Sequence, residues 1–216
     1  MLALKGCIVT IDAMGTQKEI AATIVTQEAD YVLPVKENQG HLYEEIKATF
    51  DEALGLNFRQ VPHETHKTVN KGHGRLEVRQ CWLMTRADYL DALGERPLWR
   101  NLNAIAMIRS ERQVGNEPVV VTTRYYISSL NGDAQRVLAA VRSHWGVENE
   151  LHWSLDVTFH EDLSRIRKGE GPQNFAVLRH IALNLLKQEK SAKIGLKGKR
   201  LKAGWDEAYL LKVLLH

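Results

Sequence analysis

The feature that most constrains the fold is a regular alternation of apolar runs and amphipathic segments in residues 6–53. Residues 6–12 form a short apolar run that ends on an acid, and residues 31–35 form a second apolar run, both typical of buried strands. Residues 16–28 and 38–53 have the periodicity of helices. A strand–helix–strand–helix order predicts an α/β unit with parallel strands.

Four residues suggest where these elements begin and end. Thr16 and Glu19 have the spacing of a capping box, which predicts the start of the first helix at Thr16. Asn38 is suited to cap the second helix. Pro34 has no backbone N–H to donate, so we expect it at a sheet edge or at a strand end.

The middle of the chain is rich in β-forming residues, and helical patterns follow it. The β-rich stretches, which predict an antiparallel subdomain, are residues 76–84, 104–111 and 119–130. Asp133 can cap a long helix that continues to about residue 155. Residues 175–185 predict another amphipathic helix, which we expect to pack on the sheet.

Composition places the chain among ordinary globular proteins. Of its 216 residues, 44% are hydrophobic and 25% are charged. No apolar run is long enough for a membrane-spanning helix, so we expect no membrane association. Cys7 and Cys81 lie in strand-like runs without metal-ligand spacing, which favours a reduced, cytoplasmic setting.

The net charge of +3 is modest but unevenly distributed. Residues 187–202 carry seven bases against one acid, Glu189. A basic segment favours a polyanionic partner, with nucleic acid as the default candidate. The alternative is a solvated, partly disordered tail. Charge alone does not decide between the two.

Glu148 occupies an unusual position for a carboxylate. On a helical wheel, at about 100° per residue, it is centred on an apolar stripe. The neighbours on that stripe are Val141, His144, Trp145, His152, Leu155 and Phe159. Burying an unpaired carboxylate costs several kcal/mol. We therefore expect a cation or a dedicated donor beside Glu148, and an internal salt bridge is the alternative.

Asp12 makes a matching case, because it ends an apolar strand at the sheet edge where α/β proteins gather ligands. Taken alone, it could equally be a turn or capping residue. Asp12 and Glu148 together form the kind of carboxylate pair that holds hard divalent cations such as Mg²⁺. Two such ions are suited to phosphodiester chemistry.

A zinc site is a further possibility, since His144, Glu148 and His152 recur every four residues. Three ligands on one helix face rarely converge on one tetrahedral ion, and no cysteine assists. For His152, a position in the core or facing DNA fits the pattern better than zinc ligation.

Five blocks of the sequence carry a resemblance to a known family. In chain order they are residues 5–17, 31–39, 72–79, 124–130 and 144–153. They resemble successive blocks of the H-repeat-associated, ISAs-type DDE transposases of bacterial insertion sequences. The resemblance extends from residue 1 to about residue 187, and the order of five blocks makes it specific.

The resemblance implies an α/β fold with an RNase H-like catalytic core and a β-rich insertion before the last catalytic helix. It makes Asp12 the second acid of the catalytic triad and Glu148 the third, with Mg²⁺ or Mn²⁺ as cofactor. It also implies binding to DNA, both transposon ends and target, and a homo-oligomer in the active form. The expected divisions are residues 1–60 for part of the core, 61–130 for the insertion, 131–187 for the core's C-terminal helices, and 188–216 for a basic tail.

The chain departs from the family at its start. Family members carry a first catalytic Asp on the leading strand of the fold, and residues 1–11 contain no acid. The first three strands are missing as well. We therefore expect an N-terminally truncated transposase with an incomplete core, which does not cleave DNA by itself.

Candidate DNA contacts come from two regions. In related transposases an Arg precedes the catalytic Glu by four residues and a Lys follows it by seven, where this chain has His144 and Leu155. Phosphate contacts are therefore expected from nearby basic residues, which are Arg142, Arg165, Arg167 and Lys168, with His144 and His152 as further candidates.

The second region is the β insertion, where Arg75, Glu77 and Arg79 share one strand face. They could contact the DNA backbone, or Glu77 could simply bridge the two arginines on a solvated face. Trp145 and Trp153 are expected in the core rather than as stacking platforms for bases.

Two readings of function remain from the sequence. The first is a DDE transposase fragment, whose intact enzyme cleaves DNA and transfers strands. The second is a non-catalytic DNA-binding or dimerising remnant that modulates a full-length transposase. A Glu148→Gln substitution separates them, because an enzyme loses activity whereas a binding protein keeps its affinity.

Overall fold

The computed structural model describes residues 3–72, 74–146, 151 and 153–215. The chain divides into two compact units, Met1–His144 and Trp145–His216. The first unit combines a sheet with helices, and the second is helical. In neither is a described helix long and apolar enough to cross a membrane.

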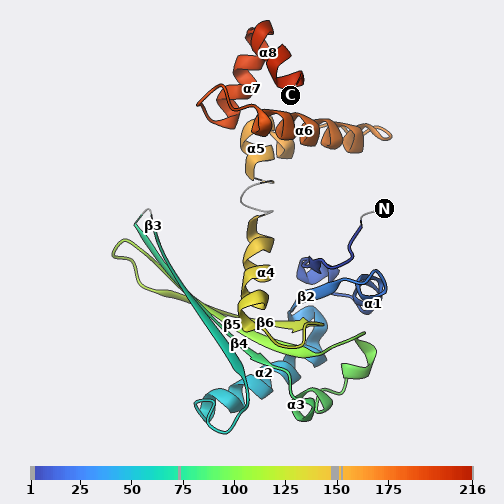
Figure 1. Ribbon diagram of the computed structural model, residues 1–216, viewed down its shortest axis with the longest axis vertical. Helices are drawn as coiled ribbons and strands as arrows, with labels where there is room; N and C mark the ends of the chain where they lie inside the picture. Colours follow the sequence, from blue (N-terminus) through green and yellow to red (C-terminus); the bar gives the residue numbers. More distant parts are fainter. Residues whose placement is uncertain (1–2, 73, 147–150, 152, 216) are drawn as a thin grey trace. The chain divides into compact units, whose positions relative to one another are not determined.

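One curled sheet of six strands organises the first unit (Figure 1). The strands are β1 (Ile8–Val9), β2 (Asp30–Val35), β3 (Glu64–Gly72), β4 (Arg75–Met84), β5 (Ala104–Val114) and β6 (Val120–Ser128). Their order is β1-β2-β6-β5-β4-β3. β1 and β2 are parallel, as predicted, and every other neighbouring pair is antiparallel.

The β-rich middle of the chain forms four strands of the same sheet as β1 and β2. β6 pairs with β2 from Val32 opposite Ser128 to Val35 opposite Tyr125, so the antiparallel strands continue the α/β sheet. β3 was not predicted at all. It pairs along its whole length with β4, and together the two form a long hairpin (Figure 1).

Helices cover both faces of this sheet. In chain order they are η1 (Ala13–Gly15), α1 (Lys18–Thr26), η2 (Glu37–Gln39), α2 (Gly40–Gly55), α3 (Ala87–Asp91), η3 (Arg96–Leu98) and α4 (Ala134–Gly146). α1 and α2 bury apolar side chains in one core cluster, and α4 buries Val137, Leu138 and Val141 in a second. The first unit is therefore a three-layer α/β/α structure.

The two core clusters follow from the period of two residues in a strand. On β2, Tyr31, Leu33 and Val35 belong to the cluster under α1 and α2, whereas Val32 belongs to the cluster under α4. Because both faces of β2 are buried, its sequence is a continuous apolar run rather than an alternating one.

The predicted starts of two helices are wrong, and the third is confirmed. α1 begins at Lys18 and α2 at Gly40, so neither Thr16 nor Asn38 is a helix cap. Asp133 does cap α4, because its Oδ1 accepts a hydrogen bond of 2.8 Å from the backbone N–H of Arg136.

Pro34 lies within β2, and β2 tolerates its missing N–H because β1 is too short to reach it. β1 pairs with β2 only as far as Tyr31, whereas β6 pairs with β2 on the opposite side, from Val32 to Val35. The missing N–H of Pro34 therefore leaves no ladder hydrogen bond to β1 unmade. This agrees with the expectation that Pro34 lies near the end of a strand.

The second unit is built from α5 (Trp153–Phe159), η5 (Glu161–Leu163), α6 (Gly171–Gln188), α7 (Leu196–Trp205) and α8 (Glu207–Leu214). α6 contacts α5, α7 and α8. Phe175, Leu178 and Ile181 on α6 are exposed and are not part of a core. The predicted long helix is described only as α4 and α5, since residues 147–150 and 152 lie outside the described residues.

The basic C-terminal segment folds into α7 and α8 and is not an extended tail. One of its bases, Lys199, is buried and donates a hydrogen bond of 3.1 Å to the carbonyl of Leu186 and another to that of Glu189. These bonds satisfy carbonyls at the end of α6. Lys199 therefore stabilises the fold and is not exposed to a polyanion.

Glu189 is the centre of this buried cluster, with only 1% of its surface exposed. Its Oε1 accepts 2.6 Å from the backbone N–H of Ser191, and its Oε2 accepts 2.7 Å from the hydroxyl of Tyr209. The pKa of Glu189 is lowered from 4.5 to about 2, first by a hydrogen bond from the Ser191 side chain, then by the Tyr209 hydroxyl, and to a smaller extent by the backbone N–H groups of Ser191 and Ala192. Burial raises the pKa of Tyr209 to about 12, so its hydroxyl remains a donor.

We expect acid to destabilise the second unit through Glu189. A carboxyl with a lowered folded-state pKa stabilises the fold above its unfolded pKa, and this contribution is lost as the pH falls from about 4.5 to about 2. Thermal melts by circular dichroism across this range should show the loss. Glu189→Gln should lower the melting temperature at neutral pH and flatten the acid dependence. The exposed Glu207→Gln should do neither, and equal behaviour of both variants would contradict the assignment.

Candidate active site

Asp12 lies on the loop that follows β1 and begins η1. Its backbone carbonyl accepts a hydrogen bond of 2.9 Å from Gly15, which closes the turn. Its side chain makes no capping bond and is 79% exposed. The alternative role as a helix cap is therefore not realised, and the carboxylate remains available to other partners.

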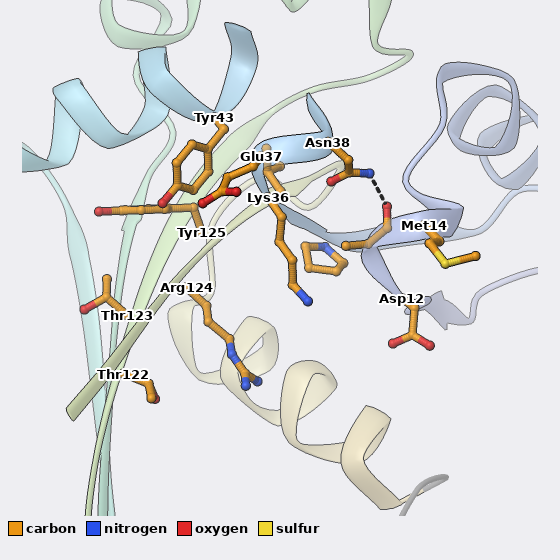
Figure 2. A pocket seen from close by; sticks show the side chains of 13 residues that line it. Asp12, Met14, Lys36, Glu37, Asn38, Tyr43, Thr122, Thr123, Arg124 and Tyr125 are labelled. Carbon is orange, nitrogen blue, oxygen red and sulfur yellow. Dashed lines mark hydrogen bonds between the residues drawn. The ribbon is translucent and has the colours of Figure 1, made fainter. Parts of the chain in front are cut away.

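Three side chains fasten the Asp12 loop to the end of β2. The hydroxyl of Thr16 donates 2.8 Å to the carbonyl of Pro34. The amide of Asn38 donates 2.8 Å to the carbonyl of Ala13, drawn as a dashed line in Figure 2. The amide of Gln39 donates 2.7 Å to the carbonyl of Thr16. Sequence reasoning missed this role, and the signal for it was the polar residues that directly follow each strand.

We expect Asn38 to position Asp12 without contacting a ligand itself. Asn38→Ala removes the bond to Ala13, so the loop should keep its fold but hold Asp12 less firmly. Affinity for Mn²⁺, measured by titration, should fall by about tenfold, as for other residues that support a metal ligand. Gln17→Ala on the same loop removes only an exposed bond of 3.3 Å and should change little. Equal losses in both variants would argue against positioning by Asn38.

His144, near the end of α4, contacts Asp12 directly. Its Nε2 lies 3.1 Å from Oδ1 of Asp12, a hydrogen bond in which the Nε2–H tautomer donates to the carboxylate. The buried face of α4 fixes this approach, because Val137 and Val141 pack under the sheet. Of the predicted site residues, Asp12 and His144 are the two that the described structure brings together.

A cavity of about 830 Å³ adjoins Asp12 (Figure 2). The loop contributes three residues to its lining. The rest come from the end of β2, the segment of η2 that follows it, the start of α2 and one half of β6. The lining residues are Asp12, Ala13, Met14, Pro34, Val35, Lys36, Glu37, Asn38, Tyr43, Thr122, Thr123, Arg124 and Tyr125.

Glu148 and His152 lie outside the described residues, so the structure does not place the predicted pair of Asp12 with Glu148. The predicted zinc site needs Glu148 and His152 together with His144, so it also lies outside the described residues. Within the described part of the chain, no three His, Cys, Asp or Glu side chains are grouped to hold a metal.

The predicted DNA-contacting residues fall into separate places. On β4, Glu77 lies 2.5 Å from Arg79 and 4.0 Å from Arg75, the arrangement of a bridging carboxylate. Arg142 of α4 donates 2.7 Å to the side chain of Asn70 on β3. The arginine contacts seen here are therefore internal to the protein, and contact with DNA stays a prediction.

In the second unit, Arg165, Arg167 and Lys168 lie together on the exposed segment between η5 and α6. Arg167 donates 2.8 Å to the carbonyl of Ser164 and 3.0 Å to that of Ile166. These bonds hold one guanidinium against its own loop. The segment thus carries three exposed basic residues, and its binding of DNA remains a prediction.

The two predicted core tryptophans are exposed instead. Trp153 at the start of α5 is 62% exposed, and Trp145 is also exposed. The tryptophan that the core does contain is Trp99, which follows η3 and packs under α2. The expectation that Trp145 and Trp153 lie in the core is therefore wrong.

Asp12 lies on the loop after a parallel strand, and α4, which follows the antiparallel strands, brings His144 to it. This arrangement agrees with the transposase family that the sequence resembles. The chain belongs to the transposase DDE domain family, whose model matches residues 1–185. Membership in this family implies an RNase H-like fold, in keeping with the mixed α/β sheet. No solved structure matches the chain.

Three curated relatives from Escherichia coli align with 99% of the chain. It is 41% identical to "Putative protein YbfL" and 40% identical to "H repeat-associated putative transposase YhhI", both of strain K12. It is 38% identical to "Putative transposase YncI" of O157:H7. The alignments cover 56%, 56% and 54% of these proteins, so the chain spans little more than half their length. The resemblance to H-repeat-associated transposases is thereby confirmed.

Proposed function

We propose that this chain supplies Asp12 and Glu148 to a metal-dependent centre that cuts and joins DNA during transposition. The observation that carries the proposal is the exposed carboxylate of Asp12 at the end of a parallel strand, 3.1 Å from His144 of α4. Glu148 follows His144 by four residues in the sequence, which supports its pairing with Asp12. Membership in the DDE family supports the assignment of these two acids.

Asp12 fits a role as a ligand of Mg²⁺ or Mn²⁺. Its Oδ1 is bonded to His144, and its Oδ2 accepts no hydrogen bond from a described residue. Hard divalent cations prefer carboxylate oxygen and keep positions for water and phosphate. When bound, such an ion would polarise the phosphate and favour the attacking water or 3′-hydroxyl.

The residues around the centre would act by position and charge. His144 would hold one carboxylate oxygen of Asp12, while Thr16 and Asn38 would fix its loop. We further propose that residues 61–130 are the β-rich insertion of an RNase H-like core. Transposon ends and target DNA would be the substrates, bound by a homo-oligomer, with the basic residues of β4 and of the segment before α6 supplying phosphate contacts.

The test compares the wild-type protein with Asp12→Asn and Glu148→Gln variants. Metal-dependent cleavage of DNA carrying an element end is measured in a protein that also supplies the first acid of the triad, and DNA binding is measured on the chain itself. We expect both variants to lose cleavage and to retain binding. Cleavage at the wild-type rate by either variant would contradict its assignment as a metal ligand.

A further inference from the structure

We propose that the cavity beside Asp12 binds one unstacked nucleotide of a DNA strand, with its phosphate at Lys36 and Arg124 and its base toward Tyr43. This inference rests on the proposed function, because it takes DNA as the ligand. It adds a site for the strand that adjoins the reacting phosphate.

The two cations come from neighbouring strands at the same level. Val35 of β2 pairs with Tyr125 of β6, so Lys36 and Arg124 are the next residues outward along the two strands. Both are exposed, and both side chains extend toward the side where the Asp12 carboxylate lies (Figure 2). Lys36 forms no ion pair with any described residue. A phosphate held between the Lys36 ammonium and the Arg124 guanidinium would gain charge-assisted hydrogen bonds.

β6 also offers an open edge at this point. β2 ends at Val35, and β6 pairs with it only over residues 125–128. Residues 120–124 of β6 have β5 on one side and no described strand on the other. The backbone groups of this edge, with the hydroxyls of Thr122 and Thr123, supply donors and acceptors for a sugar–phosphate backbone.

An aromatic wall closes the cavity on its other side. Tyr43 and Tyr125 meet edge to face with ring centroids 5.6 Å apart, and Phe50 stacks on Tyr125 at 6.0 Å. Tyr125 is buried and rigidly held, whereas Tyr43 is partly exposed and can receive a base. Stacking of this kind accepts any base, but requires it to be out of a duplex.

The carboxylate of Glu37 lies beside this wall (Figure 2). It faces Tyr43 and Tyr125, away from the ends of Lys36 and Arg124, so it does not neutralise the proposed phosphate site. A carboxylate there can accept a hydrogen bond from an exocyclic amino group of a base. The cavity volume of about 830 Å³ lies within the usual range of about 300–1,000 Å³ for pockets that hold small organic molecules.

A peptide strand added to β6 is the competing occupant of such an edge. The structure favours a nucleotide, because the charged side chains of Lys36 and Arg124 lie at this edge of β6. Charged side chains at a sheet edge oppose the addition of a peptide strand. Lys36 and Arg124 also extend toward the side of Asp12. A DNA strand whose phosphate reacts at Asp12 would therefore have its neighbouring phosphate near these two cations. If a peptide strand is the true occupant, an extended peptide should displace the oligonucleotide.

The experiment uses a short single-stranded oligonucleotide with photoreactive thymines, bound by the full chain in EDTA. Cross-linked peptides are identified by mass spectrometry, and affinity is measured by fluorescence anisotropy. We expect cross-links at Tyr43 or within residues 122–125. Lys36→Ala and Arg124→Ala should each weaken binding by about threefold to tenfold. Each should also reduce the slope of the logarithm of the binding constant against the logarithm of the salt concentration by about one.

Two controls keep the result specific. Arg59→Ala removes an exposed charge that does not line the cavity, and should leave affinity within about twofold. Lys36→Arg keeps the charge and should restore binding, which a general loss of fold would not allow. Cross-links confined to other segments, unchanged affinity in both alanine variants, or displacement of the oligonucleotide by an uncharged extended peptide would each overturn the proposal.

Failure of this inference can be told apart from failure of the proposed function. Binding in EDTA needs no metal, and Asp12→Asn removes a negative charge from the cavity lining, so this variant should bind the oligonucleotide at least as tightly as the wild type. Intact cross-linking with cleavage unaffected by Asp12→Asn would count against the proposed function alone. Lost cross-linking with cleavage still dependent on Asp12 would count against the nucleotide site alone.

Discussion

In a protein that also supplies the first acid of the triad, Asp12→Asn is expected to lower metal-dependent DNA cleavage by roughly a thousandfold or more. This is the scale on which removal of one member of a concerted catalytic group acts. Asparagine keeps the shape of the side chain but has no charge to hold a divalent cation. Its amide oxygen can still accept the hydrogen bond from His144, so the loop should keep its structure. The loss should therefore come from chemistry and leave stability unchanged.

Metal binding gives this prediction a readout that does not depend on cleavage. Titration of Mn²⁺ followed by electron paramagnetic resonance should show weaker binding in Asp12→Asn than in the wild type. Glu19→Gln, an equal change of charge at an exposed position of α1, should bind Mn²⁺ normally. If both variants bind Mn²⁺ as the wild type does, Asp12 is not a ligand of the ion.

The sequence predicted Asp12 because the signal is local. A buried strand that ends on an acid needs only adjacent residues to be recognised, and the parallel pairing of β1 with β2 follows from the helix between them. The same local reasoning failed for Thr16 and Asn38. Their side chains can cap helices, but in the fold they bond to Pro34 and Ala13, which are distant in the sequence.

β3 escaped prediction because its residues carry little apolar patterning. It pairs with a single neighbour, β4, and only alternate residues are partly buried. A strand of this kind is held by backbone hydrogen bonds and cross-strand pairs, which leave no hydrophobic period in the sequence.

The cavity beside Asp12 could not be predicted for a related reason. Lys36 and Arg124 are unremarkable exposed bases in the sequence, and each lies far from the other along the chain. They become neighbours only because β6 returns to pair with β2. Non-local strand pairing thus brings together groups whose function no single segment reveals.

Phe50→Ala is expected to destabilise the first unit by about 3–5 kcal/mol, the usual cost of emptying a buried aromatic site. Phe50 is fully buried in α2 and packs among the side chains of β2 and β6. It also stacks on Tyr125, the rigid part of the cavity wall. Urea unfolding, with hydrogen exchange of the β2 and β6 amides as a local probe, measures the change.

Leu54→Ala provides the matched control on the same helix. Leu54 is 40% exposed, so its truncation should alter stability by no more than about 0.5 kcal/mol. Because Phe50 supports Tyr125, Phe50→Ala should also weaken oligonucleotide binding under conditions where the chain is still folded. Stability lost equally in the two variants would mean that α2 contributes through its helical backbone and not through the core. In that case the link from core packing to the cavity beside Asp12 would fail as well.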